Sequence, residues 1–326
     1  MSAIQLSNVT KRFGDVEAVC DLDLTVQTGE VYGFLGPNGA GKSTTINMVL
    51  DFVRPTEGTV TVLGERVDTA GAALRERIGV LPEGFDVYSR LTGRKHIEFA
   101  IESKKADDDP DAILDRVGLS DAADRKAGGY SKGMAQRLAL GMALVGEPEL
   151  LILDEPSSGL DPNGAKEMRE IVSAEADRGA TVFFSSHVLG QVEAVCDRVG
   201  ILHKGELVTE DSIEGLREET GSEETLILTV DDATDDDLDE VRRLDGVSGA
   251  AIDGTTVTVS CVSGAKTDVI STLSGAGIEI QNIETESTSL EELFLSYTDG
   301  EGAVENGHAE SSTASTPEPT APEGSQ

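Results

Sequence analysis

Gly36-Pro37-Asn38-Gly39-Ala40-Gly41-Lys42-Ser43-Thr44 is the stretch that decides the fold of this chain. It matches G-x-x-x-x-G-K-S, the pattern of a loop that binds phosphate groups. Glycines let the backbone turn so that successive N–H groups point inward at a phosphate. Lys42 adds a charge that reaches the β- and γ-phosphates, and the Ser43 hydroxyl can coordinate Mg²⁺. We call residues 36–44 the phosphate loop.

The residues on both sides of the phosphate loop supply the strand and the helix that it requires. Val31–Leu35 is continuously apolar before it, as a buried strand is, and residues 44–50 have the character of a helix after it. A glycine-rich turn that arose by chance would not be expected to have both a buried strand before it and a helix after it. The sequence therefore predicts an α/β fold built around a nucleoside triphosphate site.

The composition excludes some classes of protein. Hydrophobic residues make up 38% of 326, which is enough for a core, and the length predicts one or two domains. The net charge of −35 comes from 61 acidic and 26 basic residues, which excludes a nucleic-acid partner because such binders neutralise phosphates with cations. The acids are spread along the whole chain. This favours a surface adapted to high salt, as in a halophile, over an acidic partner-binding tail.

Cysteine usage and hydropathy indicate the compartment. Cys20, Cys196 and Cys261 are scattered and odd in number, so we expect neither a disulfide framework nor a zinc site. Free thiols are typical of a reducing compartment. No apolar run approaches the ~18 residues that span a bilayer, and the start has no signal-peptide pattern. We expect a cytoplasmic chain.

Two acidic residues follow a second apolar run. Leu150–Asp154 leads directly into Glu155, and buried acids at a strand end need a cation or a proton. Asp154 can hold Mg²⁺, directly or through water, and Glu155 can accept a proton from water. An isolated pair of this kind is as consistent with a structural role as with a functional one. Behind a phosphate loop, the pair has the position of the second acidic motif of such ATPases.

Other candidates are weaker when each is taken alone. Glu83 and His187 follow apolar strands, at the end where α/β enzymes place ligand-contacting groups. Ser131 is a good helix N-cap, which alone is more typical of an ordinary capped helix than of an anion site. Phe13 lies in a loop between short antiparallel strands within residues 4–26. Alone, it favours a half-buried loop aromatic over a platform that stacks on a base.

Over about residues 2–215, the motifs together resemble the ATP-binding subunit of ABC transporters. They fall in the order of that family: A-loop aromatic, Walker A loop, Q-loop, signature sequence, Walker B motif, D-loop and switch histidine. The matching positions are Phe13, residues 36–44, residues 78–83, residues 130–137, residues 150–156, residues 157–162 and His187.

The resemblance implies a P-loop NTPase of ABC type, with a RecA-like core, an antiparallel β subdomain and a helical subdomain at about residues 84–140. It implies that ATP and Mg²⁺ are bound and that two copies close head to tail around two ATP molecules. The implied residues are Phe13 on adenine, residues 36–44 on the phosphates, Ser43, Glu83 and Asp154 on Mg²⁺, Glu155 and His187 in catalysis, Asp161 in the D-loop, and Ser131, Lys132, Gly133 and Met134 on the ATP of the other copy.

Two positions depart from the family pattern. The Q-loop glutamine is Glu83 here, which can still bind the metal with added charge, and its role stays open. The usual signature Leu-Ser-Gly-Gly-Gln is Tyr130-Ser131-Lys132-Gly133-Met134. Lys132 replaces a glycine and can supply charge to the phosphate bound by the other copy. Because some exporter-type members have this form, we do not interpret it as inactivation.

The last third has a different composition. A pattern of βαββαβ over residues 218–298, with an acidic helix at 235–244 and a hairpin turn at Asp253-Gly254, predicts a small α+β ferredoxin-like domain. Residues 289–295 are expected to add an amphipathic helix, and residues 299–326 a disordered tail rich in Pro, Ser and Thr. The extension resembles that of ABC-2-like exporters of drugs and antibiotics. A generic regulatory appendage is an equal alternative.

We therefore expect domain 1–217 to be a transporter ATPase, with a separate six-span permease and a second ATP-binding subunit, identical or different, as partners. It would lie at the inner face of the cell membrane through the permease. The alternative is an ABC-type ATPase that acts on translation or DNA without transport. A non-catalytic regulator is disfavoured because Lys42, Asp154 and Glu155 are intact.

Overall fold

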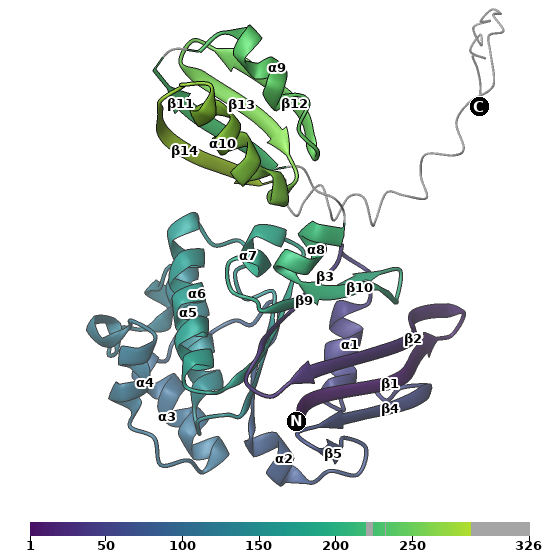
Figure 1. Cartoon of the computed structure of the whole chain (residues 1–326). Coiled ribbons are helices and arrows are strands. Elements are labelled where there is room, and N and C mark those ends of the chain that lie inside the picture. Colours follow the sequence, from purple (N-terminus) through teal and green to yellow (C-terminus); the bar gives the residue numbers. More distant parts are fainter. Residues whose placement is uncertain (220–223, 232, 288–326) are drawn as a thin grey trace, which may run out of the picture.

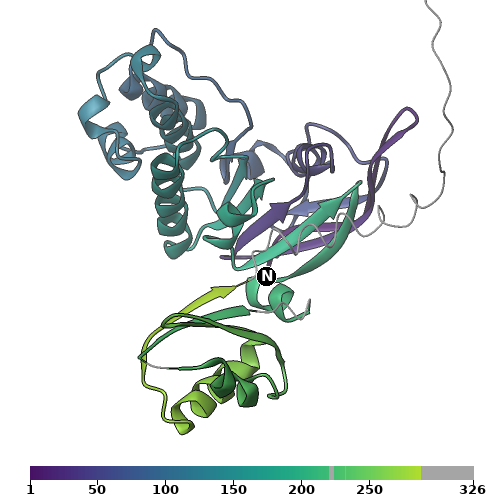
Figure 2. The same ribbon diagram turned by 90° about the horizontal axis from the view of Figure 1, so that it is seen from above.

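A computed structural model of the chain describes residues 1–219, 224–231 and 233–287 (Figure 1). Strands of this part form three sheets, with the orders β10-β9-β3-β8-β7-β6, β2-β1-β4-β5 and β12-β13-β11-β14. The first two sheets belong to one body with the helices around them, and the third belongs to a separate small domain (Figure 2).

The six-stranded sheet carries the phosphate loop at its centre. Its strands are β3 (Val31–Leu35), β6 (Ile78–Leu81), β7 (Leu150–Asp154), β8 (Thr181–Ser186), β9 (Arg198–His203) and β10 (Glu206–Ser212). All neighbours are parallel except β9 and β10. Every residue of β3, β7 and β8 is buried, as expected for strands covered on both faces. The predicted bounds of β3 and β8 are confirmed.

The four-stranded antiparallel sheet consists of β1 (Ser2–Phe13), β2 (Val16–Gln27), β4 (Glu57–Val62) and β5 (Glu65–Arg66). The expectation of short strands within residues 4–26 was wrong, because β1 and β2 have 12 residues each. Several register shifts between them let the pairing continue along a bent ribbon. Phe13 is accordingly the last residue of β1 and not a loop residue.

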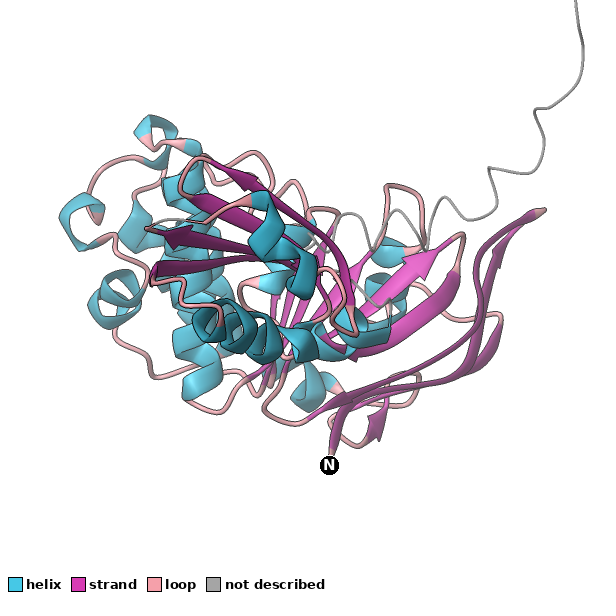
Figure 3. Cartoon of the chain, turned by 45° about the horizontal axis from the view of Figure 1, so that its top comes forward, coloured by secondary structure: helices cyan, strands magenta, loops and turns pink. Residues whose placement is uncertain are grey.

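Helices cover both faces of the central sheet (Figure 3). The helices of this body are α1 (Lys42–Val49), α2 (Ala72–Glu76), α3 (Gly93–Lys104), α4 (Pro110–Arg116), α5 (Lys132–Leu144), α6 (Pro162–Asp177), α7 (Leu189–Glu193) and α8 (Ile213–Glu219). Of these, α4 packs on α3 and α5 and not on the sheet. Two large apolar cores result. One lies between the central sheet, α1 and the antiparallel sheet, and the other lies between the central sheet and the helices of residues 93–145 and 162–193.

The third sheet confirms the predicted ferredoxin-like topology. It consists of β11 (Glu224–Val230), β12 (Val247–Asp253), β13 (Thr256–Cys261) and β14 (Ile280–Ser287), with α9 (Leu238–Val241) and α10 (Lys266–Gly275) in the connections. Its antiparallel order β14-β11-β13-β12 is that of a βαββαβ domain. The acidic helix expected at 235–244 is shorter, because a 3-10 turn at Asp235–Asp237 with a Thr234 capping box precedes α9.

Some predictions concern residues outside the described part. The amphipathic helix at 289–295 and the tail at 299–326 lie there. The expected boundary between residues 217 and 218 falls within α8. Among the described residues, no helix is both long enough and apolar enough to cross a membrane.

Candidate nucleotide-binding and catalytic site

The phosphate loop wraps around its own lysine. Gly39 and Gly41 have φ values of +84° and +113°, which L-residues with side chains rarely adopt. Lys42 is 6% exposed, and its Nζ donates a hydrogen bond to the Gly36 carbonyl at 2.7 Å. Gly36 packs against the carbonyl of Leu202 so closely that a Cβ would collide with it. The loop is therefore shaped by glycine at three of its positions.

Glu155 lies next to the lysine at the end of β7. Its Oε1 is 3.4 Å from the Nζ of Lys42, and its Oε2 is 2.8 Å from the Nδ1 of His187. Glu155 has a φ of +50°, a left-handed conformation that costs roughly 1–2 kcal/mol for a residue with a side chain. Two contacts hold it there, since its N–H donates to the hydroxyl and the carbonyl of Ser185 at 3.1 and 3.3 Å. Oε1 is buried and accepts no hydrogen bond.

Asp154 is buried directly behind the phosphate loop. The Ser185 hydroxyl donates to its Oδ1 at 2.5 Å. Burial raises the pKa of Asp154, and the negative charge of Glu83 raises it further, whereas the hydrogen bond from Ser185 lowers it. A cation placed between Ser43 and Asp154 would relieve this unfavourable burial of charge.

A cavity of about 300 Å³ opens in front of these groups. Its lining residues come from β2, the phosphate loop, the loop after β6 and the loop after β7: Ala18, Asn38, Gly39, Gly41, Lys42, Ser43, Thr44, Glu83 and Glu155. The cavity thus unites one ammonium, a row of loop amides and two carboxylates. The positive loop and its lysine suit a polyphosphate, and the excess of carboxylates suits a divalent cation that accompanies it.

The donor set fits Mg²⁺ bound together with a nucleotide. Mg²⁺ is usually held by one or two protein oxygens, with substrate phosphates and waters as the other ligands. Among the described residues, no three His, Cys, Asp or Glu side chains converge to hold a metal without such help. Glu83 is near enough to raise the pKa of Asp154, and Ser43 is near enough to lower it, so the three groups lie in one neighbourhood.

Phe13 does not line the cavity. It is 50% exposed at the end of β1, and the Nζ of Lys11 lies 4.8 Å from the centre of its ring. Its ring is therefore accessible to a flat ligand, although the structure does not bring it into contact with the phosphate-binding groups.

The signature residues also lie away from the cavity of their own chain. Ser131 caps α5 by accepting from the N–H of Met134 at 3.2 Å, and a Cβ on Gly133 would meet open space. Lys132 lies directly against Gly159 in the turn after Glu155. Asp161 caps α6 by accepting from Gly164.

Two residues of the site were missed in the sequence. Ser185 contacts both Asp154 and Glu155, and Ala18 forms part of the cavity wall. A serine at the end of the apolar run of β8 was a usable signal. The sequence around Ala18 has no such signal, because its role depends on how β2 folds over the phosphate loop.

Fold and site together define a P-loop NTPase with a β subdomain and a helical subdomain. The family model for ABC transporters matches residues 19–158. The bacitracin transport ATP-binding protein BcrA of Bacillus licheniformis is 40% identical over 220 residues, 66% of this chain and 71% of that protein. The daunorubicin resistance ATP-binding protein DrrA3 of Streptomyces coeruleorubidus is 34% identical over 316 residues, 91% of this chain and 96% of that protein.

Solved structures agree with these relatives. An ATP-binding subunit of an ABC transporter has a TM-score of 0.61 and 26% identity, over 68% of this chain and 94% of that chain. The dimeric cassette MJ0796 has a TM-score of 0.58 and 25% identity, over 64% of this chain and 98% of that chain.

The chain belongs to the ATP-binding proteins of the ABC transporter family. It is an ATP-hydrolysing subunit that uses ATP and Mg²⁺, and it works with a separate membrane permease and a second ATP-binding subunit. The alternative of an ATPase for translation or DNA is not favoured.

Proposed function

We propose that the chain powers export and that residues 36–44 hold the phosphates of the ATP that drives it. The observation that carries the proposal is the cavity in which Lys42, Ser43 and Glu155 meet. The loop amides and the Nζ of Lys42 bind the β- and γ-phosphates, and the ring of Phe13 stacks on adenine. Phosphate binding would separate Lys42 from Glu155, because the ammonium would then face a stronger anion.

In this proposal, Glu155 is the general base and His187 contacts the γ-phosphate. The carboxylate orients a water and accepts its proton as the water oxygen attacks phosphorus. The side chain of His187 is 42% exposed, so it can reach a bound phosphate. Its contact with Glu155 holds the carboxylate in place. Mg²⁺, held by Ser43, Asp154 and Glu83, would neutralise charge on the phosphate oxygens.

The signature residues would complete the site of a second copy. Ser131, Lys132, Gly133 and Met134 begin α5 and lie outside the cavity of their own chain. The exposed helix start offers N–H groups to an anion. We propose that the turn that contains Asp161 also lies at the interface with the second copy.

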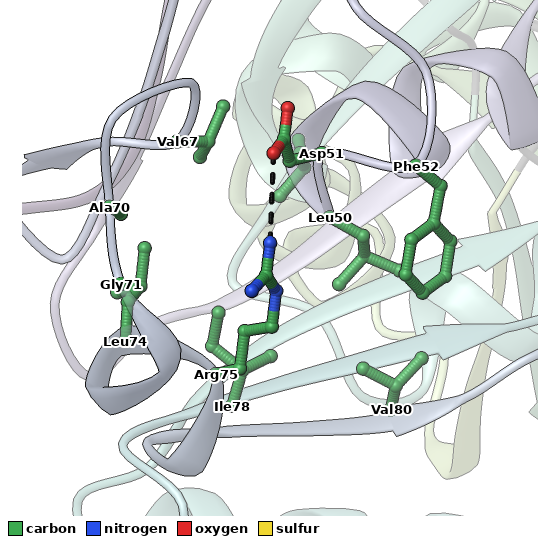
Figure 4. Close-up of a pocket in the computed structure, with 11 residues that line it drawn as sticks. Leu50, Asp51, Phe52, Val67, Ala70, Gly71, Leu74, Arg75, Ile78 and Val80 are labelled. Atoms are coloured by element: carbon green, nitrogen blue, oxygen red, sulfur yellow. Dashed lines mark ion pairs between the residues drawn. The ribbon is translucent and has the colours of Figure 1, made fainter.

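The permease would dock beside the edge strand β6. A groove of about 310 Å³ between β6, α3 and α5 is lined mainly by apolar side chains, including Phe85, Phe99 and Met142. A smaller hollow of about 160 Å³ on the other face of β6 shares Ile78 and Val80 with it (Figure 4). The groove adjoins the loop of Glu83, so the same loop can contact the permease and the metal.

Figure 4 also shows the polar side of the smaller hollow. Asp51 and Arg75 form an ion pair at 3.6 Å across its mouth, and Phe52 is 71% exposed beside it. Exposed aromatic side chains of this kind are typical of interfaces.

Export at the inner face of the cell membrane is supported by the relatives. BcrA is named for bacitracin transport, DrrA3 for daunorubicin resistance, and a Burkholderia lata relative for Nod factor export. We further propose an ATPase domain of residues 1–217, a ferredoxin-like domain of 218–298 and a tail of 299–326. The tail and part of the second domain lie outside the described residues.

Reconstitution with the permease tests this function. Purified chain and permease in vesicles should hydrolyse ATP faster than the chain alone and should move a drug-like cargo out of the ATP-containing side. Phe99→Ala should abolish the stimulation and keep the basal ATPase activity. Val208→Ala, an exposed residue of β10, is the control and should keep both activities. Stimulation that survives Phe99→Ala would reject the docking groove, and recovery with ribosomes instead of a permease would reject transport.

A further inference from the structure

A two-residue turn connects β9 to β10 beneath the phosphate loop. Lys204 and Gly205 have φ values of +48° and +88°, as in the tight turns that suit the twist of a hairpin. This turn contains no residue of the motifs that bind or hydrolyse ATP. It nevertheless lies directly against the groups that do.

Gly205 bonds with its backbone to two different segments. Its N–H donates to the carbonyl of Ala40 in the phosphate loop at 2.9 Å, and its carbonyl accepts from the N–H of Cys20 in β2 at 2.9 Å. A single residue therefore connects the loop that faces phosphate with the strand that forms another wall of the cavity.

The carbonyl of Ala18 lies at the meeting point of these segments. A Cβ placed on Gly205 would be 3.0 Å from this oxygen, and a Cβ placed on Gly41 would be 2.6 Å from it. Both distances are below ordinary van der Waals contact between such atoms. Ala18 itself lines the cavity. Any side chain at Gly205 must therefore push β2 away by a few tenths of an ångström, and with it the wall of the cavity that faces the phosphate loop.

We propose that Gly205 is a positioning residue for ATP: it sets the spacing between the phosphate loop and the β2 wall of the nucleotide cavity. It touches no atom of the nucleotide and acts through Ala40 and Ala18. The inference rests on the proposed assignment of residues 36–44 as the phosphate loop. It adds a residue about 160 positions away in the chain, outside the motifs of the resemblance.

Gly205→Ala tests the proposal, with Gly64→Ala as the matched control. Gly64 has a similar φ of +81° in the turn between β4 and β5, but a Cβ there would meet nothing within 4 Å. In both variants an alanine must adopt a left-handed backbone conformation, so both should lose a similar amount of stability. Only Gly205→Ala should raise the KM for ATP, by about tenfold, with a smaller change in kcat. Its phosphate-loop amides should also exchange hydrogen faster.

Gly205→Asn covers the case in which the alanine variant does not fold. Asparagine accepts a left-handed backbone more readily but still carries a Cβ. It should fold and still raise the KM. In the unaltered chain, ATP should slow hydrogen exchange at Gly205 together with the loop, which requires no variant.

The results separate the two proposals. An unaltered chain that fails to bind ATP would reject the site assignment itself. If the unaltered chain binds ATP, an unchanged KM in the Gly205 variants, an equal rise in Gly64→Ala, or exchange at Gly205 that ATP leaves unchanged would overturn only the positioning role.

Discussion

The Nζ of Lys42 lies 3.4 Å from the Oε1 of Glu155, and both side chains are 6% exposed. The carboxylate that we propose as the general base therefore lies next to the lysine, in the position proposed for a phosphate. Removing one partner of an ion pair that is buried in this way is strongly destabilising. In the proposed mechanism, ATP would supply a new anion for the lysine and would leave the carboxylate available to a water molecule.

Glu155→Gln should keep ATP binding and reduce turnover by about 10²–10⁴, because an amide cannot accept the proton of the attacking water. Binding of a fluorescent ATP analogue and release of phosphate measure the two effects. Glu170→Gln, on the exposed face of α6, is the control and should change neither. Turnover equal to that of the unaltered chain would assign the general base to another residue.

Mixing two inactive variants should restore activity. Lys42→Ala removes the phosphate contact and Ser131→Arg blocks the signature face, so each alone should be inactive. In a mixed dimer, one of the two composite sites has both defects and the other has none. An equal mixture should therefore recover about a quarter of full activity, since half of the dimers are mixed. A mixture that stays inactive would contradict a site shared between copies.

Phe13→Ala should raise the KM for ATP about tenfold, since stacking of a base on an aromatic ring is worth roughly 1–3 kcal/mol. Phe13→Tyr should preserve the affinity, because the ring is kept. Phe52→Ala removes another exposed ring, away from the cavity, and should leave the KM unchanged. Unaltered affinity in Phe13→Ala would mean that adenine is held elsewhere.

Tyr32→Phe should lower the free energy of unfolding at neutral pH, and the difference from the unaltered chain should become smaller at alkaline pH. The Tyr32 hydroxyl donates to the Oε1 of Glu210 at 2.8 Å, and its loss should cost about 1 kcal/mol. Burial raises the pKa of Tyr32 well above its ordinary value. The stability that the neutral hydroxyl contributes is complete below the unfolded pKa near 10, and it is lost as pH rises toward the folded pKa.

Urea unfolding at pH 7.5 and at pH 10.5 measures the difference between Tyr32→Phe and the unaltered chain, which should be smaller at the higher pH. Tyr88→Phe, at an exposed tyrosine, is the control and should leave stability nearly unchanged at pH 7.5. A difference of the same size at both values would show that ionisation of Tyr32 does not affect folding.

The sequence alone predicted those parts of the site that are determined by residues adjacent in the chain. The phosphate loop, β3 and β8 follow from local pattern, and the ferredoxin-like order was confirmed by the pairing of β11 with β13 and β14. Ser185 left a local signal at the end of an apolar run, but its contacts with Asp154 and Glu155 join two strands distant in the chain. The contacts of Ala18 and Gly205 also join distant segments, and no local pattern encodes them. The salt adaptation inferred from the charge of −35 stays a prediction, which unfolding measured against KCl concentration tests.

The strand order of the central sheet puts the groove proposed for the permease and the connection to the small domain at opposite edges. The edge strand β6 adjoins the groove proposed for the permease, whereas the opposite edge strand β10 leads through α8 into the ferredoxin-like domain. The strand β3, which carries the phosphate loop, lies between them. A permease bound in this groove would therefore not occupy the opposite edge of the sheet, from which the chain continues into the small domain.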